Sequence, residues 1–257
     1  MGDKQILYFV KYPEAGKVKT RLARDMGTEE AARLYKKATE KNLAVLAEVE
    51  EPFGLTVVYD PPEKEAGIKV WLKPFQIEDF LPQRGAGLGE RLEHAFRFAF
   101  QRRPKELPVR CVSPVLNAPG LQKRRKTGRF AAVMALGSDT LALTPQIVTE
   151  GFEALEAFDC VIGPAKDGGY YLIGLNFEDA GIFRNIPWST HEVYQSTVQY
   201  VEREELSYYR LPMLEDLDEI KNLMSAQLTE RSEGKLPRES IPASFKRGSI
   251  SRFPSRE

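Results

Sequence analysis

Two aspartates follow short apolar runs of the sequence, at points where predicted strands end. Asp139 comes after the apolar run at residues 130–136. Asp167 lies in a polar turn between two further apolar runs, at residues 160–162 and 170–175. Such runs predict buried strands, and open α/β sheets bind ligands in the loops at the carboxyl edge of their strands. If these runs share one sheet, the two carboxylates converge at that edge, where we expect a nucleotide and a metal ion.

Asp139 also has a purely structural explanation. A carboxylate in a turn can simply cap it by accepting hydrogen bonds from backbone amides, and this alternative stays open for Asp139. Beside Asp167, the paired glycines Gly168 and Gly169 remove side-chain bulk. Because glycine tolerates a positive φ and lets the backbone approach a ligand closely, this turn is a candidate binding site.

A cluster of cations follows the predicted first strand, at residues 5–10. The loop contains Gly16 and then a strand-to-helix turn with three cations and a hydroxyl group, from Lys17, Lys19, Arg21 and Thr20. In nucleotide-binding folds, such a turn directs backbone N–H groups and positive charge at phosphates. The alternative is a solvated basic loop, because short clusters of Lys and Arg are common.

Further candidates lie at the starts of two predicted helices. Gly89 and Arg91 belong to a glycine-rich start before a helix that ends near Gln101, which is a candidate anion cradle or simply a flexible helix N-terminus. Asp216 and Asp218 place two carboxylates at the start of a short helix, where capping accounts for one of them.

One tryptophan and two histidines complete the set of side chains with a potential role. Trp188 can stack on a base or a sugar ring, or it can anchor the core. His94 and His191 are the only histidines, and both fall in predicted helices far apart in sequence. We therefore assign neither histidine a catalytic role.

The elements that must position these residues alternate between helices and strands. We expect a long helix at residues 29–48 with Thr28 as its N-cap. A second helix, at residues 145–155, has Thr144 as its N-cap and Pro145 as its first residue. This alternation is typical of the α/β class.

Three shorter segments are less regular. Ser189 and Glu192 predict a capping box before another helix. Residues 63–81 are poorly periodic, and we expect only a short strand near Val70 there. A final strand is predicted at residues 208–211.

Composition limits the classes of function. The chain has 257 residues with 37 basic and 37 acidic side chains, so no net charge draws it to nucleic acid or to a membrane surface. Two cysteines suggest no disulfide framework and fit a reducing cytoplasm. No apolar run is long enough to span a membrane or to form a signal peptide.

The chain is predicted to form one domain over residues 1–231. Within it, residues 102–129 hold nine basic residues and one acid and form an inserted loop, for which a mobile solvated loop outweighs a site for polyanions. Residues 232–257 are rich in Pro, Ser and charge, and we expect them to be disordered. The oligomeric state is not predicted.

Several motifs, in the order in which they occur, resemble the DUF2064 family. They are KYPEAGKVKTRL at 11–22, GLGER at 87–91, GSD at 137–139, GPAKDGGYYLIGL at 163–175, PWST at 187–190 and DLD at 216–218. The resemblance covers roughly residues 5–228 without the basic insert. It implies glycosyltransferases of the GT-A, or nucleotide-diphospho-sugar transferase, fold, some of them associated with arsenosugar biosynthesis. That fold is a Rossmann-like sandwich with a mixed, mainly parallel central sheet.

The resemblance, combined with the residues themselves, leads to the following expected roles. Nucleotide binding is assigned to Lys11, Gly16, Lys19, Thr20, Arg21, Gly89 and Arg91. Binding of the donor or acceptor is assigned to Gly168, Gly169, Tyr170 and Trp188. A divalent metal, Mg²⁺ or Mn²⁺, is assigned to Asp139 and Asp216, and catalysis to Asp167 and Asp218.

One departure from the family pattern concerns the metal. After the first acid the family usually has Pro, any residue or an acid, and then Leu, whereas Asp139 is followed by Thr140, Leu141 and Ala142. The expected proline and second carboxylate are missing. Metal binding would weaken unless Asp167, Asp216 or Asp218 supplies the missing ligand.

Three functions are compatible with these observations. The first is a metal-dependent glycosyltransferase that uses a nucleotide sugar and a small-molecule acceptor. The second is a nucleotidyltransferase that releases pyrophosphate, because the KTRL and DGG elements also resemble guanylyltransferases of the phospholactate type. The third is a nucleotide-binding protein without catalysis.

Overall fold

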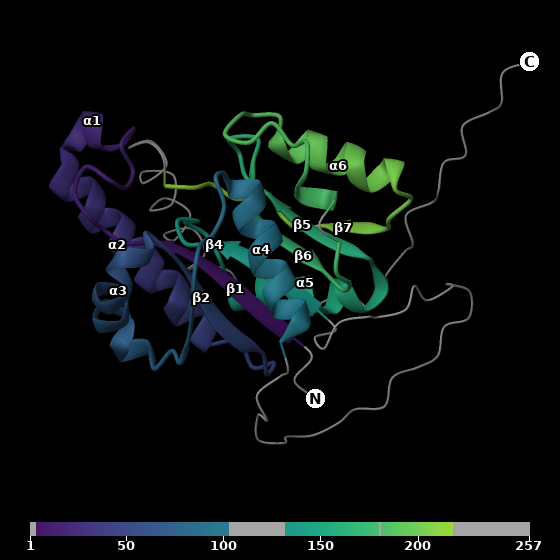
Figure 1. The fold of residues 1–257 in the computed structure, drawn as a ribbon, viewed down its shortest axis with the longest axis horizontal. Coiled ribbons are helices and arrows are strands. Elements are labelled where there is room, and N and C mark those ends of the chain that lie inside the picture. The colour runs from purple at the N-terminus through teal and green to yellow at the C-terminus, as the bar shows by residue number, and fades with distance from the viewer. Residues whose placement is uncertain (1–3, 103–131, 180, 218–257) are drawn as a thin grey trace, which may run out of the picture.

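A sheet with the strand order β3-β2-β1-β4-β6-β5-β7 forms the centre of the computed structural model (Figure 1). The structure describes residues 4–102, 132–179 and 181–217. The basic insert beyond Arg102, Asp218 with the predicted helix after it, and the C-terminal tail lie outside these residues. The strands are β1 Lys4–Lys11, β2 Gly54–Asp60, β3 Asp79–Pro82, β4 Ala132–Gly137, β5 Cys160–Pro164, β6 Tyr170–Leu175 and β7 Tyr208–Arg210.

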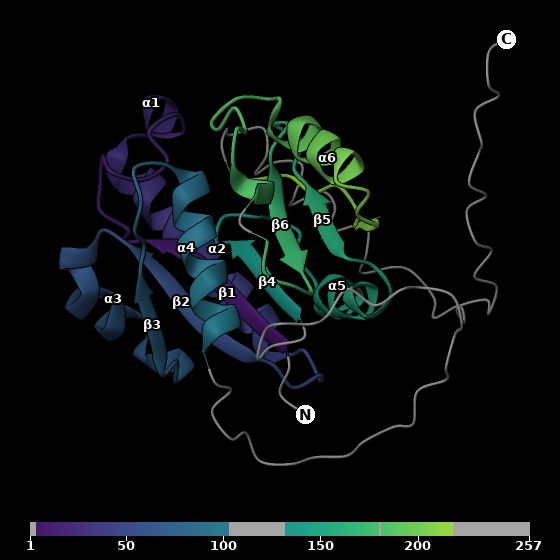
Figure 2. The ribbon, with the colours of Figure 1, turned by 45° about the vertical axis from the view of Figure 1, so that its right-hand side comes forward.

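The sheet is mixed and mainly parallel, as the sequence predicts. Strands β1 to β4 are parallel neighbours, β5 is parallel to β7, and β6 runs antiparallel to both β4 and β5. Figure 2 shows the arrow of β6 pointing opposite to the arrows of β4 and β5. The single reversed strand therefore leaves the carboxyl ends of β1, β4 and β5 at the same edge.

Strand β1 is buried on both faces, which accounts for its continuous apolar sequence. Ile6, Leu7, Tyr8 and Val10 are all at most 1% exposed. Leu7 lies opposite Thr56 of β2 on one side and Ala135 of β4 on the other. The cationic loop therefore follows a central strand of the sheet.

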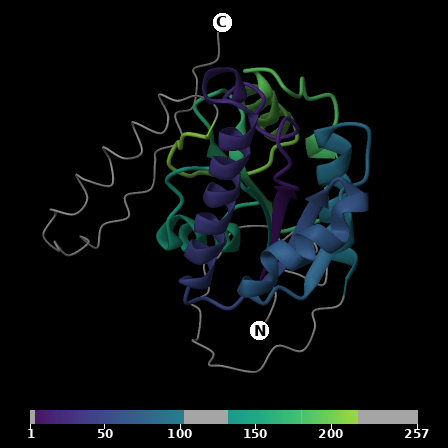
Figure 3. The same ribbon diagram turned by 90° about the vertical axis from the view of Figure 1, so that its left-hand side faces the viewer.

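Helices cover both faces of the sheet (Figures 1 and 3). On one face, α2 Thr28–Ala47, α3 Glu65–Leu72 and α5 Pro145–Ala157 pack against one core cluster. On the other face, α4 Leu88–Gln101 and α6 Val193–Arg203 pack against a second core cluster. The remaining short elements are α1 Ala23–Met26, η1 Pro62–Lys64, η2 Lys73–Phe75 and η3 Gly181–Phe183. None of the described helices is long and apolar enough to cross a membrane.

Two of the predicted helix starts are wrong. Thr28 makes no capping bond and is the first helical residue. The residue before it, Gly27, has a φ of +87° and occupies the N-cap position of α2. Ser189 and Glu192 form no capping box. Instead, the Thr190 hydroxyl donates to the carbonyl of Pro187 and accepts from the N–H of Glu192, so a separate turn precedes α6.

The poorly periodic segment at residues 63–81 forms a helix and a strand instead of a strand near Val70. Val70 lies in α3 and is exposed, while Ile68 and Leu72 of the same helix are fully buried. Gly67 leaves room for Tyr12 there, because a Cβ atom would lie 2.8 Å from that ring. A strand, β3, then follows at Asp79–Pro82, where none was predicted.

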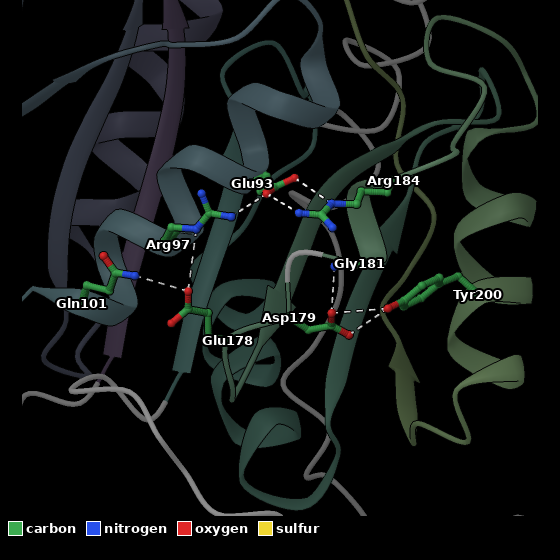
Figure 4. Close-up of polar contacts among 8 residues, drawn as sticks. All are labelled: Glu93, Arg97, Gln101, Glu178, Asp179, Gly181, Arg184 and Tyr200. Atoms are coloured by element: carbon green, nitrogen blue, oxygen red, sulfur yellow. Dashed lines mark hydrogen bonds and ion pairs between the residues drawn. The ribbon is translucent and has the colours of Figure 1, made fainter.

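A polar network joins α4 to the segment between β6 and α6 (Figure 4). Glu93 accepts hydrogen bonds from Arg97 of its own helix and from Arg184. The carboxylate of Asp179 accepts from the N–H of Gly181 and from the hydroxyl of Tyr200 on α6. These contacts fix the start of the segment that carries Trp188.

The start of α5 gives a test of the fold. The Thr144 hydroxyl accepts from the N–H of Ile147, as predicted for an N-cap. We expect Thr144→Ala to lower the free energy of unfolding by about 1 kcal/mol, and Thr144→Ser to keep the bond and stay within a few tenths of wild type. Urea denaturation measures both. Equal stability of the Ala and Ser variants would contradict the assigned cap.

Candidate functional site

A cavity of about 920 Å³ opens at the carboxyl edge of the sheet. Its walls come from the end of β1 and the loop after it, the end of β4, the turn between β5 and β6, and the segment before α6. Ligand pockets commonly have volumes of about 300–1,000 Å³. The edge predicted to bind a ligand therefore has a cavity of suitable size.

Most of the predicted site residues line this cavity. They are Lys11, Lys19, Thr20, Arg21, Asp139, Asp167, Gly169, Tyr170, Trp188 and Asp216. Gly16, Gly89, Arg91 and Gly168 do not line it. Carboxylates and cations more than one hundred residues apart in the chain are thus brought together in one place.

Lys19 and Asp139 form an ion pair inside the cavity. The Lys19 side chain is 10% exposed and the Asp139 side chain is 32% exposed. Lys19 has a φ of +47°, which is uncommon for a residue with a side chain. The loop therefore places the ammonium group of Lys19 against the carboxylate of Asp139, just after β4, and the positive φ costs some backbone strain.

Asp216 is joined to the same turn by backbone pairing. Thr140 and Asp216 form an antiparallel bridge, and the N–H of Leu217 donates to the carbonyl of Asp139 over 2.9 Å. The Thr140 hydroxyl also donates to Oδ1 of Asp216 over 3.0 Å. Thr140, at the position where the family pattern has a proline, therefore orients the carboxylate of Asp216.

Ala142, by contrast, is exposed and does not line the cavity. Leu141, at the position where the family pattern allows an acid, does not line the cavity either. The second carboxylate beside Asp139 comes from Asp216 instead.

The electrostatics of this pair favour a bound cation. Burial, followed by the negative charge of Asp139, raises the pKa of Asp216 to about 7, although the charge of Lys19 and the bond from Thr140 oppose the shift. Two carboxylates that resist ionising together gain from a positive ion between them. The pair therefore has the charge distribution of a site for a divalent cation.

The donor set also suits such an ion. Carboxylate oxygens are hard ligands, and Mg²⁺ is usually bound by one or two carboxylates together with substrate phosphates and water. Among the residues that the structure describes, no group of three or more His, Cys, Asp or Glu side chains could hold a metal alone. Asp139 and Asp216 fit an ion whose coordination the substrate completes.

A polar stripe on α2 holds the Asp139 turn in place. Asn42, 1% exposed, donates through its amide to the carbonyls of Ser138 and Thr140, on either side of Asp139. The hydroxyl of Tyr35 accepts from the N–H of Lys11 and lies 2.9 Å from the Ser138 hydroxyl. The sequence analysis missed these supports, although polar residues at 35, 39 and 42 on the apolar side of a helix are a readable signal.

Arg91 and Gly89 serve the walls of the cavity rather than its interior. The Arg91 guanidinium donates to Gln83 over 3.1 Å and lies 3.3 Å from the carboxylate of Asp60, so it braces the ends of β2 and β3. A Cβ atom at Gly89 would lie 2.4 Å from Nε1 of Trp188. Gly89 therefore makes room for that indole. The contacts of Gly89 and Arg91 are thus with neighbouring protein groups, whereas the sequence predicted that they bind an anion.

The turn at Asp167 is packed against the segment before α6. Oδ1 of Asp167 accepts from the N–H of Gly169 over 2.8 Å. Gly168 has a φ of +91°, and a Cβ atom there would lie 2.1 Å from the carbonyl oxygen of His191. Only glycine fits this contact, and it fixes Asp167 relative to the opposite wall.

His191 was missed by the sequence analysis. It lies in a turn and not in the predicted helix, and it lines the cavity. Gln83 also lines the cavity and was not predicted. His94 lies on α4, as predicted, and does not line the cavity.

Comparisons with known proteins agree with this fold. The profile of a family described as "Uncharacterized protein conserved in bacteria (DUF2064)" matches residues 43–190. A crystal structure described as a "putative nucleotide-diphospho-sugar transferase" from Desulfovibrio desulfuricans G20 is 33% identical, with 90% of this chain and 89% of that chain covered and a TM-score of 0.73. No curated protein matches the sequence.

A more distant structure shares the fold alone. The inositol-1-phosphate CTP transferase from T. maritima is 11% identical, with 92% of this chain and 98% of that chain covered and a TM-score of 0.50. The expected GT-A type of α/β fold is confirmed by the structure from Desulfovibrio desulfuricans G20.

The raised pKa of Asp216 gives a test by pH. Folding raises the pKa of Asp216 from 3.8 to about 7. Between these pH values the folded protein keeps a proton on Asp216 that the unfolded chain releases. The free energy of unfolding therefore falls as pH rises through this range. Asp216→Asn removes the charge and can still accept from Thr140. We therefore expect this variant to be more stable than wild type by up to about 4 kcal/mol at pH 8, and by only about 1.6 kcal/mol at pH 5.

Denaturation at both pH values in a chelating buffer measures this difference. A gain that is the same at pH 5 and pH 8 would contradict the proposed charge repulsion at Asp216.

Proposed function

This chain belongs to the DUF2064 family, and on that basis we propose that it is a metal-dependent glycosyltransferase with a nucleotide-sugar donor and a small-molecule acceptor. The observation that carries the proposal is the meeting of Lys19 with Asp139, beside Asp216, in the cavity at the carboxyl edge of the sheet. Phosphates need cations, and a leaving diphosphate needs its growing charge neutralised. The cavity offers side chains for both tasks.

The two sides of the cavity differ in charge. The last residue of β1, Lys11, and the loop after it contribute four cationic side chains to the lining, with Lys17, Lys19 and Arg21 coming from the loop. On the opposite side Trp188 and Tyr170 pack edge to face with their ring centres 6.1 Å apart. Among the described residues, that aromatic side contributes no Lys or Arg to the lining. The asymmetry supports a phosphate at the loop and an uncharged ring, such as a sugar, at the aromatic side.

The protein side chains would then divide the work as follows. Lys19 and Arg21 bind phosphate oxygens of the donor, and Asp139 and Asp216 hold the divalent ion. A divalent ion held there would supply positive charge to the leaving diphosphate. Asp167, held at the rim by the N–H of Gly169, accepts the proton of the acceptor hydroxyl while that oxygen bonds to the sugar and the bond from sugar to phosphate breaks. The role predicted for Asp218 falls on a residue that the structure does not describe.

A nucleotidyltransferase is the second candidate. It is favoured by the four cations at the end of β1 and in the loop after it, because a nucleoside triphosphate carries more charge than a diphosphate. It is disfavoured by the aromatic side, because a phosphate-bearing acceptor also needs cations to bind it. The products distinguish the two reactions: glycosyl transfer releases a nucleoside diphosphate, and nucleotidyl transfer releases pyrophosphate.

Turnover across a panel of nucleotide sugars and nucleoside triphosphates, with Mn²⁺ or Mg²⁺ present, tests the proposal. We expect release of a nucleoside diphosphate from one of the nucleotide sugars. Asp139→Asn should lower that turnover by about 100-fold or more, because it removes a charged ligand of the ion. Asp25→Asn is the matched control, since Asp25 is exposed on α1 and does not line the cavity. Release of pyrophosphate instead would establish the second candidate, and unchanged turnover of Asp139→Asn would remove Asp139 from the mechanism.

A further inference from the structure

We propose that Lys19 competes with the divalent ion for Asp139, so that the ion binds tightly only when a phosphate draws Lys19 away. This inference rests on the proposed function, because it concerns the same phosphate and metal sites. It adds a rule for the order of binding: the empty cavity has low affinity for the ion, and a phosphate-bearing donor raises that affinity.

The ammonium group of Lys19 occupies the oxygen that a cation would use. Nζ of Lys19 contacts Oδ2 of Asp139, one of the few carboxylate oxygens that the cavity offers to a cation. With only 10% of its side chain exposed, Lys19 is largely sheltered from water at this contact. An ammonium group is a compact charge with three donors, and it cannot share an oxygen with a metal ion without strong repulsion.

The backbone on both sides of the pair is held in place. The carbonyl of Lys19 accepts from the N–H of Ala23 over 2.9 Å, which ties the loop to α1. Asp139 is fixed through its own carbonyl by Leu217 and through its neighbours by Asn42. The two groups therefore remain close, and only the long side chain of Lys19 can swing between partners.

The number of protein ligands is small. With Asp139 and Asp216 as the donors, an ion must take its other ligands from substrate or water. A phosphate placed by the loop offers Lys19 another anionic partner and offers the ion further oxygens. Both effects favour binding of phosphate and ion together, and such coupling is reciprocal.

Lys17 provides the matched control. It lines the same cavity from the same loop and carries the same charge, but the ion pair with Asp139 belongs to Lys19. The N–H of Lys17 donates to the carbonyl of Glu14 over 3.0 Å, so a hydrogen bond within the loop also fixes the backbone of Lys17. Loss of Lys17 thus reports the effect of removing one positive charge from the cavity without releasing Asp139.

The experiment measures Mn²⁺ binding by equilibrium dialysis, with and without inorganic pyrophosphate, a probe that needs no knowledge of the base or sugar. It compares wild type with Lys19→Met, Lys19→Gln and Lys17→Met. Because free Mn²⁺ and its pyrophosphate complex equalise across the membrane, the excess on the protein side is the ion held by the protein. Circular dichroism verifies that each variant is folded.

Without pyrophosphate, we expect both Lys19 variants to bind Mn²⁺ at least about tenfold more tightly than wild type, and Lys17→Met to change affinity by less than about threefold. Pyrophosphate should tighten Mn²⁺ binding to wild type by about tenfold or more, and this gain should shrink in the Lys19 variants.

Two results would overturn the inference, and they can be told apart. If wild type holds Mn²⁺ with pyrophosphate but the Lys19 variants bind Mn²⁺ alone no better than wild type or Lys17→Met, the competition is wrong and the proposed metal site stands. If no protein holds Mn²⁺ under either condition, the metal dependence of the proposed function fails together with the inference.

Discussion

Asp139 and Asp216 carry like charges on two segments that backbone hydrogen bonds hold side by side. Like unit charges about 4 Å apart repel by roughly 4 kcal/mol at a surface-like dielectric, so such a pair needs compensation. The structure provides it through the ammonium group of Lys19, the hydroxyl of Thr140 and a raised pKa at Asp216. Under the proposed function, a divalent cation held by the two carboxylates would supply the remaining compensation.

The topology of the sheet explains why these groups meet. Because β6 alone is reversed, β1, β4 and β5 end at one edge and deliver the cationic loop, Asp139 and the Asp167 turn there. The helices then fix the walls. Asn42 and Tyr35 of α2 brace one side, while α4 accommodates Trp188 at Gly89 and holds Arg184 through Glu93 on the other. These contacts hold the cationic and the aromatic sides of the cavity in place.

Much of this frame could be predicted from the sequence. Strongly apolar or amphipathic runs correctly predicted β1, α2, α4, α5 and the β5–β6 pair, because burial on one or both faces determines those patterns. The N-cap Thr144 was confirmed by its hydrogen bond. The residues predicted at strand ends also meet at one cavity, since parallel strands bring their following loops together.

What the sequence did not predict depends on contacts between distant segments. Helix α3 buries only Ile68 and Leu72 and contains a glycine beside the ring of Tyr12, so its apolar pattern is too short and too irregular to predict a helix. The roles of Gly89 and Arg91 are set by Trp188 and by Asp60 with Gln83. His191 enters the cavity because a turn, and not the predicted capping box, precedes α6.

The most direct test of the account is a crystal structure of the protein with Mn²⁺ and the nucleoside diphosphate that stabilises it best. The account predicts one anomalous peak about 2.0–2.3 Å from oxygens of Asp139 and Asp216 and from the diphosphate, with Lys19 moved to the phosphate. A peak elsewhere, or a nucleotide bound outside the cavity with the Lys19–Asp139 pair intact, would contradict it.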